Sequence, residues 1–186
     1  MISEKYTKPA VILHWLIAIG MLYNVISMLL LDDDARSRPF IDLHKSIGIT
    51  VLGLLILRLL WRAANRPPAL PSTYKPWERT LSLGVHSLLY VMILAIPLSG
   101  WVMNSASYNK NTGQPYGIDL YHVVPWFNLP LFNAMDLTAR KGWHEFLGGV
   151  HGLGGWILLG LLVLHIGGAL KHQFLDKEKE LQRMWF

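Results

Sequence analysis

Four long stretches of this chain contain few charged side chains. They cover residues 9–31, 43–62, 81–103 and 143–171. An α-helix of about 20 apolar residues crosses a bilayer core about 30 Å thick, so each stretch is long enough to span a membrane. Only 16% of the 186 residues are charged, against roughly 25% in typical globular proteins. The sequence therefore predicts an all-α integral membrane protein, a four-helix bundle forming a single domain.

The flanks of these stretches define the expected spans. Asp32-Asp33-Asp34 follows the first stretch in place of a cleavage site, so we expect a retained span rather than a signal peptide. The second lies between an Arg36-Ser37-Arg38-Pro39 turn and the Asn65–Pro68 linker. We expect a kink at Pro97 in the third. The fourth is longer than a bilayer requires, so its first two turns are expected to stand outside the membrane.

Lys and Arg are distributed unequally between the two sides of these spans. Of 17 such residues, six fall on the side opposite the termini: Arg36, Arg38, Lys45, Lys110, Arg140 and Lys141. Because basic residues are retained on the cytoplasmic side, both termini are expected in the cytoplasm of a bacterial cell, with the protein in the inner membrane. The same bias explains the net charge of +5, so no nucleic-acid partner is expected.

The chain contains no cysteine. This excludes disulfides, thiolate metal sites, iron–sulfur clusters and covalently attached c-type haem. Histidine remains for metal chemistry, and five of the eight histidines lie inside the expected spans: His14, His44, His86, His151 and His165. Ionisable residues inside a membrane are costly and indicate function. One buried histidine could satisfy itself with a carbonyl, but five in so short a chain suggest a shared role.

Helical spacing separates these histidines into two levels. His151 and His165 are 14 residues apart, which places them on one helix face about 21 Å from each other. They cannot share one metal ion, but two stacked haems would each take one histidine from each of two helices. Depth then selects the partners. His14 and His165 lie about 9 Å from the cytoplasmic boundary, and His44 and His151 lie about 27 and 30 Å from it.

Other histidines compete for these positions. His86 lies at nearly the depth of the inner pair, so it could replace His14 or His165, or contact a haem propionate or a quinone. His144 is a reserve candidate, about 31 Å from His165. For His122 in the outer loop and His172 at the cytoplasmic mouth, we expect ordinary solvated side chains.

Residues beside the histidines have two interpretations each. Glycines on the second and fourth spans could leave room for haem or could simply allow close helix packing; they are Gly48, Gly53, Gly148, Gly149, Gly152, Gly154, Gly155 and Gly160. Arg58 and Arg62 could neutralise propionates of the inner haem or could extend to the membrane surface. Lys45 could do the same for the outer haem.

The outer loop, Asn104 to Lys141, contains an aromatic segment from Tyr116 to Phe132. Tyr and Trp concentrate at membrane interfaces, so this segment could lie on the bilayer as a lid. It could equally be a soluble-facing loop without chemical importance.

Several short motifs occur in a characteristic order. Ile12-Leu13-His14-Trp15-Leu16 opens the first span and Leu43-His44-Lys45-Ser46-Ile47-Gly48 the second. His86-Ser87-Leu88-Leu89-Tyr90 and Ile96-Pro97-Leu98-Ser99-Gly100 occur in the third, and His151 and His165 precede Ala169-Leu170-Lys171-His172 in the fourth. Together they resemble the bacterial cytochrome b561 family, four-helix di-haem cytochromes b related to membrane subunits of nickel-iron hydrogenase and formate dehydrogenase.

The resemblance implies function as well as fold. It implies b-type haem held by His14 with His165 and by His44 with His151, and electron exchange with the quinone pool. In one branch of the family it implies oxidation of superoxide at the outer haem, with ubiquinone as acceptor. A positive surface would attract superoxide, but the expected outer residues sum to about minus one, which leaves only a local cluster such as Lys45, Arg140 and Lys141.

The sequence thus predicts a di-haem cytochrome b that passes single electrons between the periplasmic face and a quinone. Superoxide would donate at the outer face, or quinol would reduce the haems and a periplasmic partner would accept the electron. Two alternatives stay open. The chain could be the cytochrome b anchor of a larger dehydrogenase or hydrogenase, or a haem-free transporter whose histidines form a proton or metal pathway.

Overall fold

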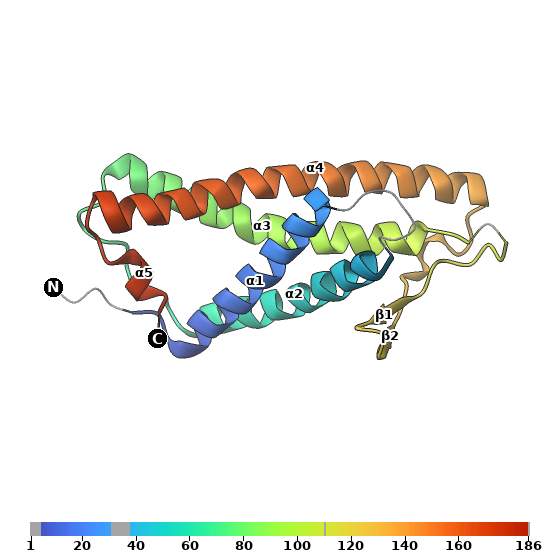
Figure 1. Ribbon diagram of the computed structural model, residues 1–186, viewed down its shortest axis with the longest axis horizontal. Helices are drawn as coiled ribbons and strands as arrows, with labels where there is room; N and C mark the ends of the chain where they lie inside the picture. Colours follow the sequence, from blue (N-terminus) through green and yellow to red (C-terminus); the bar gives the residue numbers. More distant parts are fainter. Residues whose placement is uncertain (1–4, 31–37, 110, 186) are drawn as a thin grey trace.

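Four long helices make up most of the molecule (Figure 1). The computed structural model describes residues 5–30, 38–109 and 111–185. Its long helices are α1 (Lys8–Leu30), α2 (Arg38–Ala64), α3 (Pro76–Ala106) and α4 (Leu137–Leu170). All four are long and apolar enough to cross a membrane. The predicted all-α, four-span fold is confirmed. Expectations for Leu31, Asp32-Asp33-Asp34, Arg36, Ser37 and Lys110 lie outside the described residues.

Polar residues begin two of the helices well before the apolar stretches. The backbone N–H of Lys75 donates to the Glu78 carboxylate at 2.9 Å, with Pro76 in the first turn of α3. Asp136 accepts a hydrogen bond from Ala139 N at 2.9 Å and caps α4. Such caps satisfy N–H groups that have no partner within the helix. The helices therefore extend past the hydropathy boundaries.

Two expected loop segments are helical for the same kind of reason. Arg140 and Lys141, placed in the outer loop by the sequence analysis, lie in the first turns of α4. Arg38 and Pro39, expected in a turn, begin α2, because the fixed φ of proline suits the start of a helix. Pro97 lies inside α3, which continues through it as one helix.

The core lies midway along the bundle. α3 lies alongside α4, and α1 packs on α2 while crossing the other helices obliquely (Figure 1). Nine buried apolar side chains form the core: Ile17, Met21, Val25, Val51, Leu55, Val85, Leu89, Leu158 and Leu161. On α4 these residues separate His151 from His165, and on α1 and α2 they follow His14 and His44. The core thus divides two histidine-bearing levels.

Large apolar side chains also cover the outside of the helices. Ile19, Leu60 and Val163 are each more than 60% exposed. Contiguous apolar surface of this kind is rare on soluble monomers. In a membrane the same side chains face lipid at no cost, so the surface agrees with the four spanning helices.

A small β-hairpin connects α3 to α4. Strand β1 (Ile118–Leu120) pairs antiparallel with β2 (Val124–Trp126), and the 3₁₀ turn η2 (Pro130–Phe132) follows. Figure 1 shows the hairpin projecting from the bundle near the start of α2. Its turn residue Tyr121 is anchored there, with its N–H donating to Ser46 Oγ at 2.9 Å and its hydroxyl 2.7 Å from Thr50 Oγ1. We call this the loop end of the bundle.

Both terminal segments meet at the opposite end. A π-helical turn, η3 (Lys171–Leu175), extends α4 and leads to the short helix α5 (Glu180–Arg183). The N–H of Tyr6 donates to the carbonyl of Arg183 at 3.1 Å, and the indole of Trp15 donates to the carbonyl of Met184 at 2.8 Å. We call this the terminal end.

Candidate functional site

The structure brings one pair of histidines together near the loop end. His44 from α2 and His151 from α4 face each other with their ring centres 6.0 Å apart. Two imidazole nitrogens on opposite sides of one metal ion each lie about 2 Å from it, which puts the ring centres about 6 Å apart. The observed separation therefore suits two axial ligands of one metal.

A second pair lies toward the terminal end. His14 from α1 and His165 from α4 have ring centres 6.2 Å apart. This is the same spacing as in the first pair, although the partner of the α4 histidine now comes from a different helix. Both pairs expected from depth along the helices are thus juxtaposed in the fold.

His86 from α3 joins the second pair. Its ring centre lies 5.0 Å from that of His165, closer than two ligands on opposite sides of one metal would stand. Its Nδ1 donates to the carbonyl of Ser82 at 2.7 Å. The side chain is exposed, whereas His14 and His165 are half-buried. The spacing and burial favour His14 over His86 as the partner of His165.

Serine fixes the orientation of His44. The hydroxyl of Ser27 donates to the carbonyl of Asn24 at 2.9 Å, so its oxygen accepts from Nδ1 of His44 at 3.1 Å. A proton on Nδ1 leaves the Nε2 lone pair available for a metal. Metal-binding histidines characteristically donate their second N–H in this way, which fixes the ring and raises its basicity.

The partner ring is held by the same device. Nδ1 of His151 donates to the carbonyl of Ile96 at 3.0 Å and lies 3.1 Å from Ser99 Oγ, which itself donates to Ile96. The ring packs directly on α3 because residue 100 is glycine. A Cβ there would stand 2.9 Å from Cε1 of His151, closer than atoms can approach without a shift.

A cavity adjoins this pair. Its volume is about 420 Å³, and both His44 and His151 line it. Glycine shapes its wall, since a Cβ on Gly155 would stand 2.6 Å from Sδ of Met28. The buried Asn24 Oδ1, also at this wall, has no hydrogen-bond partner among the residues that the structure describes. The residues fit a haem: two oriented imidazoles, an apolar cavity of ligand size and small residues where a macrocycle would lie.

The basic residues expected near the haems have defined partners. Arg58 donates to the carbonyl of Ala10 at 2.8 Å and to the hydroxyl of Tyr90 at 3.1 Å. Arg62 lies over the Tyr90 ring, 5.7 Å from its centre. Lys45 lines the cavity beside His44 and pairs with Asp42 at 3.7 Å. Arg58 of α2 therefore contacts α1 at Ala10, one helical turn before His14. Lys45 lies beside the outer pair.

The cations considered for attracting superoxide each contact other groups of the protein. Lys45 pairs with Asp42, and Lys141 pairs with Glu145 at 3.7 Å. Arg140 is only 5% exposed, and its guanidinium donates to the carbonyls of Gly113 and Ser107. Arg140 thus acts as a support for the loop before the hairpin.

The remaining histidines lie outside both pairs. Nδ1 of His144 lies 3.0 Å from the carbonyl of Met103 and ties α4 to α3. His122 is exposed in the hairpin turn with φ of 58°. The expectation that His172 is an ordinary solvated side chain is wrong, because its ring stacks on Tyr74 with ring centres 4.1 Å apart and its side chain is only 13% exposed.

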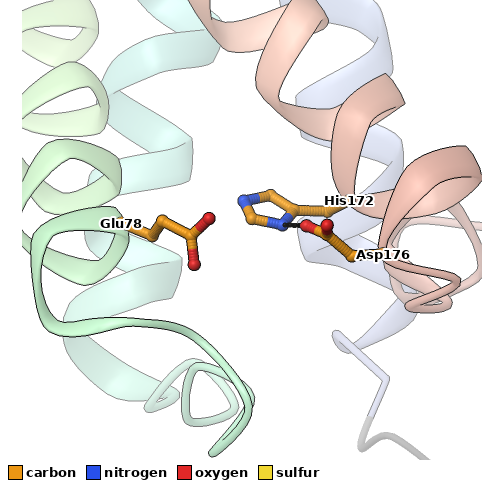
Figure 2. Close-up of side chains that lie close together, drawn as sticks. All are labelled: Glu78, His172 and Asp176. Carbon is orange, nitrogen blue, oxygen red and sulfur yellow. Dashed lines mark hydrogen bonds and ion pairs between the residues drawn. The ribbon is translucent and has the colours of Figure 1, made fainter.

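A cluster of charged residues surrounds His172 at the terminal end. Figure 2 shows Glu78 from α3 facing His172 of η3 and Asp176, the residue that follows η3. Their ligand atoms lie within 4.8 Å of one another, a spacing compatible with a metal. The ammonium of Lys171 already binds both carboxylates, lying 2.8 Å from Asp176 Oδ2. Lys171 thus supplies the cation, and the cluster fastens α3 to the π-helical turn.

The charges of this cluster affect nearby titrations. The hydrogen bond from Lys171, followed by that from His172, holds the pKa of Asp176 below its ordinary value, with burial partly opposing. Burial, and then the neighbouring Glu180 carboxylate, raises the pKa of Tyr74. Asp176 is therefore ionised and Tyr74 neutral at neutral pH.

Sequence reasoning missed the residues that orient the rings. Ser27 and Ser99 act on histidines of other helices, and no local pattern marks such contacts. Ser99 and Gly100 do lie in one of the motifs that carried the family resemblance. The network of Glu78, Lys171 and Asp176 was also missed, because Glu78 is distant in sequence from the other two residues.

Comparison with known proteins identifies relatives of this chain. The family model described as Prokaryotic cytochrome b561 matches residues 5–186. The chain is 34% identical over 185 residues to Cytochrome b561 homolog 2 of Escherichia coli (strain K12), which covers 97% of this chain and 91% of that protein. It is 25% identical over 187 residues to Cytochrome b561 homolog 1 of the same organism, covering 97% of each. Both histidine pairs fall within these matches.

Proposed function

Because the chain belongs to the prokaryotic cytochrome b561 family, and is therefore a b-type cytochrome of the bacterial inner membrane that transfers electrons, we propose that it holds two haems at two levels. We further propose that it carries electrons between the outer face and the quinone pool. His44 and His151 would bind one haem, and His14 and His165 the other. The observation that carries the proposal is the pairing itself, with ring centres 6.0 and 6.2 Å apart.

The chain's own residues would supply the positioning. Ser27 and Ile96 hold the Nδ1 protons of His44 and His151, which leaves the Nε2 of each ring available to bind iron. When bound, haem supplies an iron that gains and loses a single electron. With two histidines binding each iron, the protein would relay electrons.

Helix α4 carries one histidine of each pair and so runs between the two levels. His151 and His165 lie about 21 Å apart along the helix, and the buried core residues Leu158 and Leu161 lie between them. The apolar filling would keep water away from the path between the two sites. We therefore expect electrons to pass across the membrane through the bundle interior.

Charge distribution supports an orientation. Eleven of the 17 Lys and Arg belong to the side of the termini, so the terminal end would face the cytoplasm and the hairpin the periplasm. Arg58 would then neutralise propionates of the inner haem, and Lys45 those of the outer haem.

The charged residues at the loop end bear on which species exchanges electrons with the outer haem. The contacts of Lys45, Arg140 and Lys141 give little support to electrostatic attraction of superoxide. We therefore favour a periplasmic redox partner over superoxide as the species that exchanges electrons with the outer haem, with quinone at the other end of the route.

Rapid mixing tests the proposal. The purified holoprotein, reduced with dithionite under anaerobic conditions and freed of excess reductant, is mixed with a short-chain ubiquinone while haem absorbance is followed. We expect the haem signal to become oxidised, in proportion to the quinone added. Ubiquinone that leaves the haems reduced would contradict the quinone assignment. In a second arm, superoxide is supplied to the oxidised protein, and rapid haem reduction would favour superoxide as donor.

A further inference from the structure

A second cavity lies at the terminal end, apart from the histidine pairs. Its volume is about 530 Å³. Three segments build it: the chain before α1 with its first turn, the last turns of α2 with the following linker, and Tyr90 of α3. The lining residues are Lys5, Tyr6, Thr7, Ala10, Arg58, Trp61, Arg62, Asn65, Arg66, Pro67, Pro68, Ala69 and Tyr90. No histidine of either pair is among them.

This cavity lining is positively charged. It includes four cations, Lys5, Arg58, Arg62 and Arg66, and among the described residues no Asp or Glu lines the cavity. The cavity therefore carries a concentrated positive potential suited to an anion.

Hydrogen bonds hold the cavity in shape. Arg58 is fixed at one wall by Ala10 and Tyr90, so Arg62 and Arg66 are the side chains that would bind the lipid phosphate. The indole of Trp61 donates to Thr7 Oγ1 at 2.8 Å and closes one wall. The side chains of Arg62 and Arg66 are exposed, so the positive rim is accessible from outside.

The location identifies the kind of anion. Arg58, Trp61 and Arg62 lie in the last turns of a membrane-spanning helix, at the level where lipid headgroups meet the acyl chains. The lining combines cations with Ala10, Pro67 and Pro68, so it offers contacts to a charged group and to apolar chains together. Basic pockets between spanning helices bind anionic headgroups in this way. We propose that this cavity binds the phosphate headgroup of an anionic phospholipid.

Lipid binding to the holoprotein tests the proposal. Delipidated protein in detergent is titrated with phosphatidylglycerol and, separately, with phosphatidylcholine, and bound lipid is counted by native mass spectrometry. The test variant is Arg62→Gln with Arg66→Gln. The matched control, Lys177→Gln with Lys179→Gln, removes the same charge from exposed residues at the same end but outside the cavity. We expect the test variant to bind phosphatidylglycerol about tenfold more weakly, with the control unchanged.

Each other outcome overturns the assignment. Equal losses in test and control variants would indicate general attraction rather than a site, and equal binding of phosphatidylcholine would remove the need for an anion. Inorganic phosphate that displaces the lipid at equal concentration would indicate a free phosphate site. Loss of haem from the test variant would assign the cavity to propionates. The single variant Arg66→Gln, at an exposed linker residue, serves if the double variant folds poorly.

Discussion

Each histidine near the loop end depends on a different helix for its orientation. His44 of α2 has the hydroxyl of Ser27 of α1 as its Nδ1 partner, and His151 of α4 has Ile96 and Ser99 of α3. The Ser27 hydroxyl is the Nδ1 partner of His44 in the structure, whereas the carbonyl of Ile96 would remain for His151 if Ser99 were removed. The two serines therefore occupy similar positions but are not equally necessary.

Alanine at the two serines should separate these roles. We expect Ser27→Ala to weaken haem binding about tenfold or more, because loss of a histidine's second hydrogen bond costs about 10- to 100-fold in metal affinity. We expect Ser99→Ala to have a smaller effect. The loss of hydrogen bonding should also make the outer haem easier to reduce in Ser27→Ala. Haem retention during dilution, together with a redox titration followed by absorbance, measures both effects.

The ranking of the two variants is the decisive part of this result. Wild-type haem content in Ser27→Ala, or a larger loss in Ser99→Ala than in Ser27→Ala, would show that the Nδ1 contacts do not position the ligands.

Among the elements, the four helices were accessible to sequence reasoning and the shorter pieces were not. Long apolar stretches predict spanning helices directly, and depth along them was enough to pair His44 with His151. The strands β1 and β2 have three residues each, and Pro125 lies in the second, so no alternating pattern marks them. Hydrogen bonds from Tyr121 to side chains of α2 anchor the hairpin. No local sequence pattern predicts these contacts.

The ends of the helices were predicted less well than their middles. Glu78 and Asp136 begin α3 and α4 outside the apolar stretches through capping contacts. Consequently Arg140, expected on an outer loop, is a buried helical residue that binds loop carbonyls. Hydropathy locates the membrane-spanning part of a helix, but polar contacts decide where the helix starts.

The π-helical turn that ends α4 should confer acid sensitivity. Asp176 has a folded pKa below its ordinary value near 3.8, chiefly because of Lys171. Its ionised form therefore stabilises the folded state above that value, and this contribution is lost as the pH falls below it. We expect the Tm of the wild type in detergent to fall between about pH 5 and about pH 3, and to fall less in Asp176→Asn.

Asp119→Asn provides the comparison for that experiment. Asp119 is an exposed carboxylate on the hairpin at the opposite end, so its replacement should leave the acid-dependent fall of Tm as in the wild type. If Asp176→Asn and Asp119→Asn gave the same Tm profile, the Lys171 network would not contribute to acid sensitivity.

On the scale of the whole molecule, the bundle separates two sites by a buried apolar layer. α4 takes part in both sites, while α1 completes one pair and α2 the other. The lipid-facing surface and the core are both apolar, and the two histidine pairs lie on either side of that core. Such an arrangement suits a protein that carries charge across a membrane without opening a water-filled path.

Haem per chain tests the two-level arrangement most directly. Pyridine haemochrome quantitation would be applied to the purified wild type and to single alanine replacements of His14, His44, His86, His151 and His165. We predict two b-type haems per chain in the wild type, about one in each replacement of a paired histidine, and two in His86→Ala. A single haem in the wild type, or haem loss in His86→Ala while His165→Ala retains both, would contradict the proposed ligand pairs.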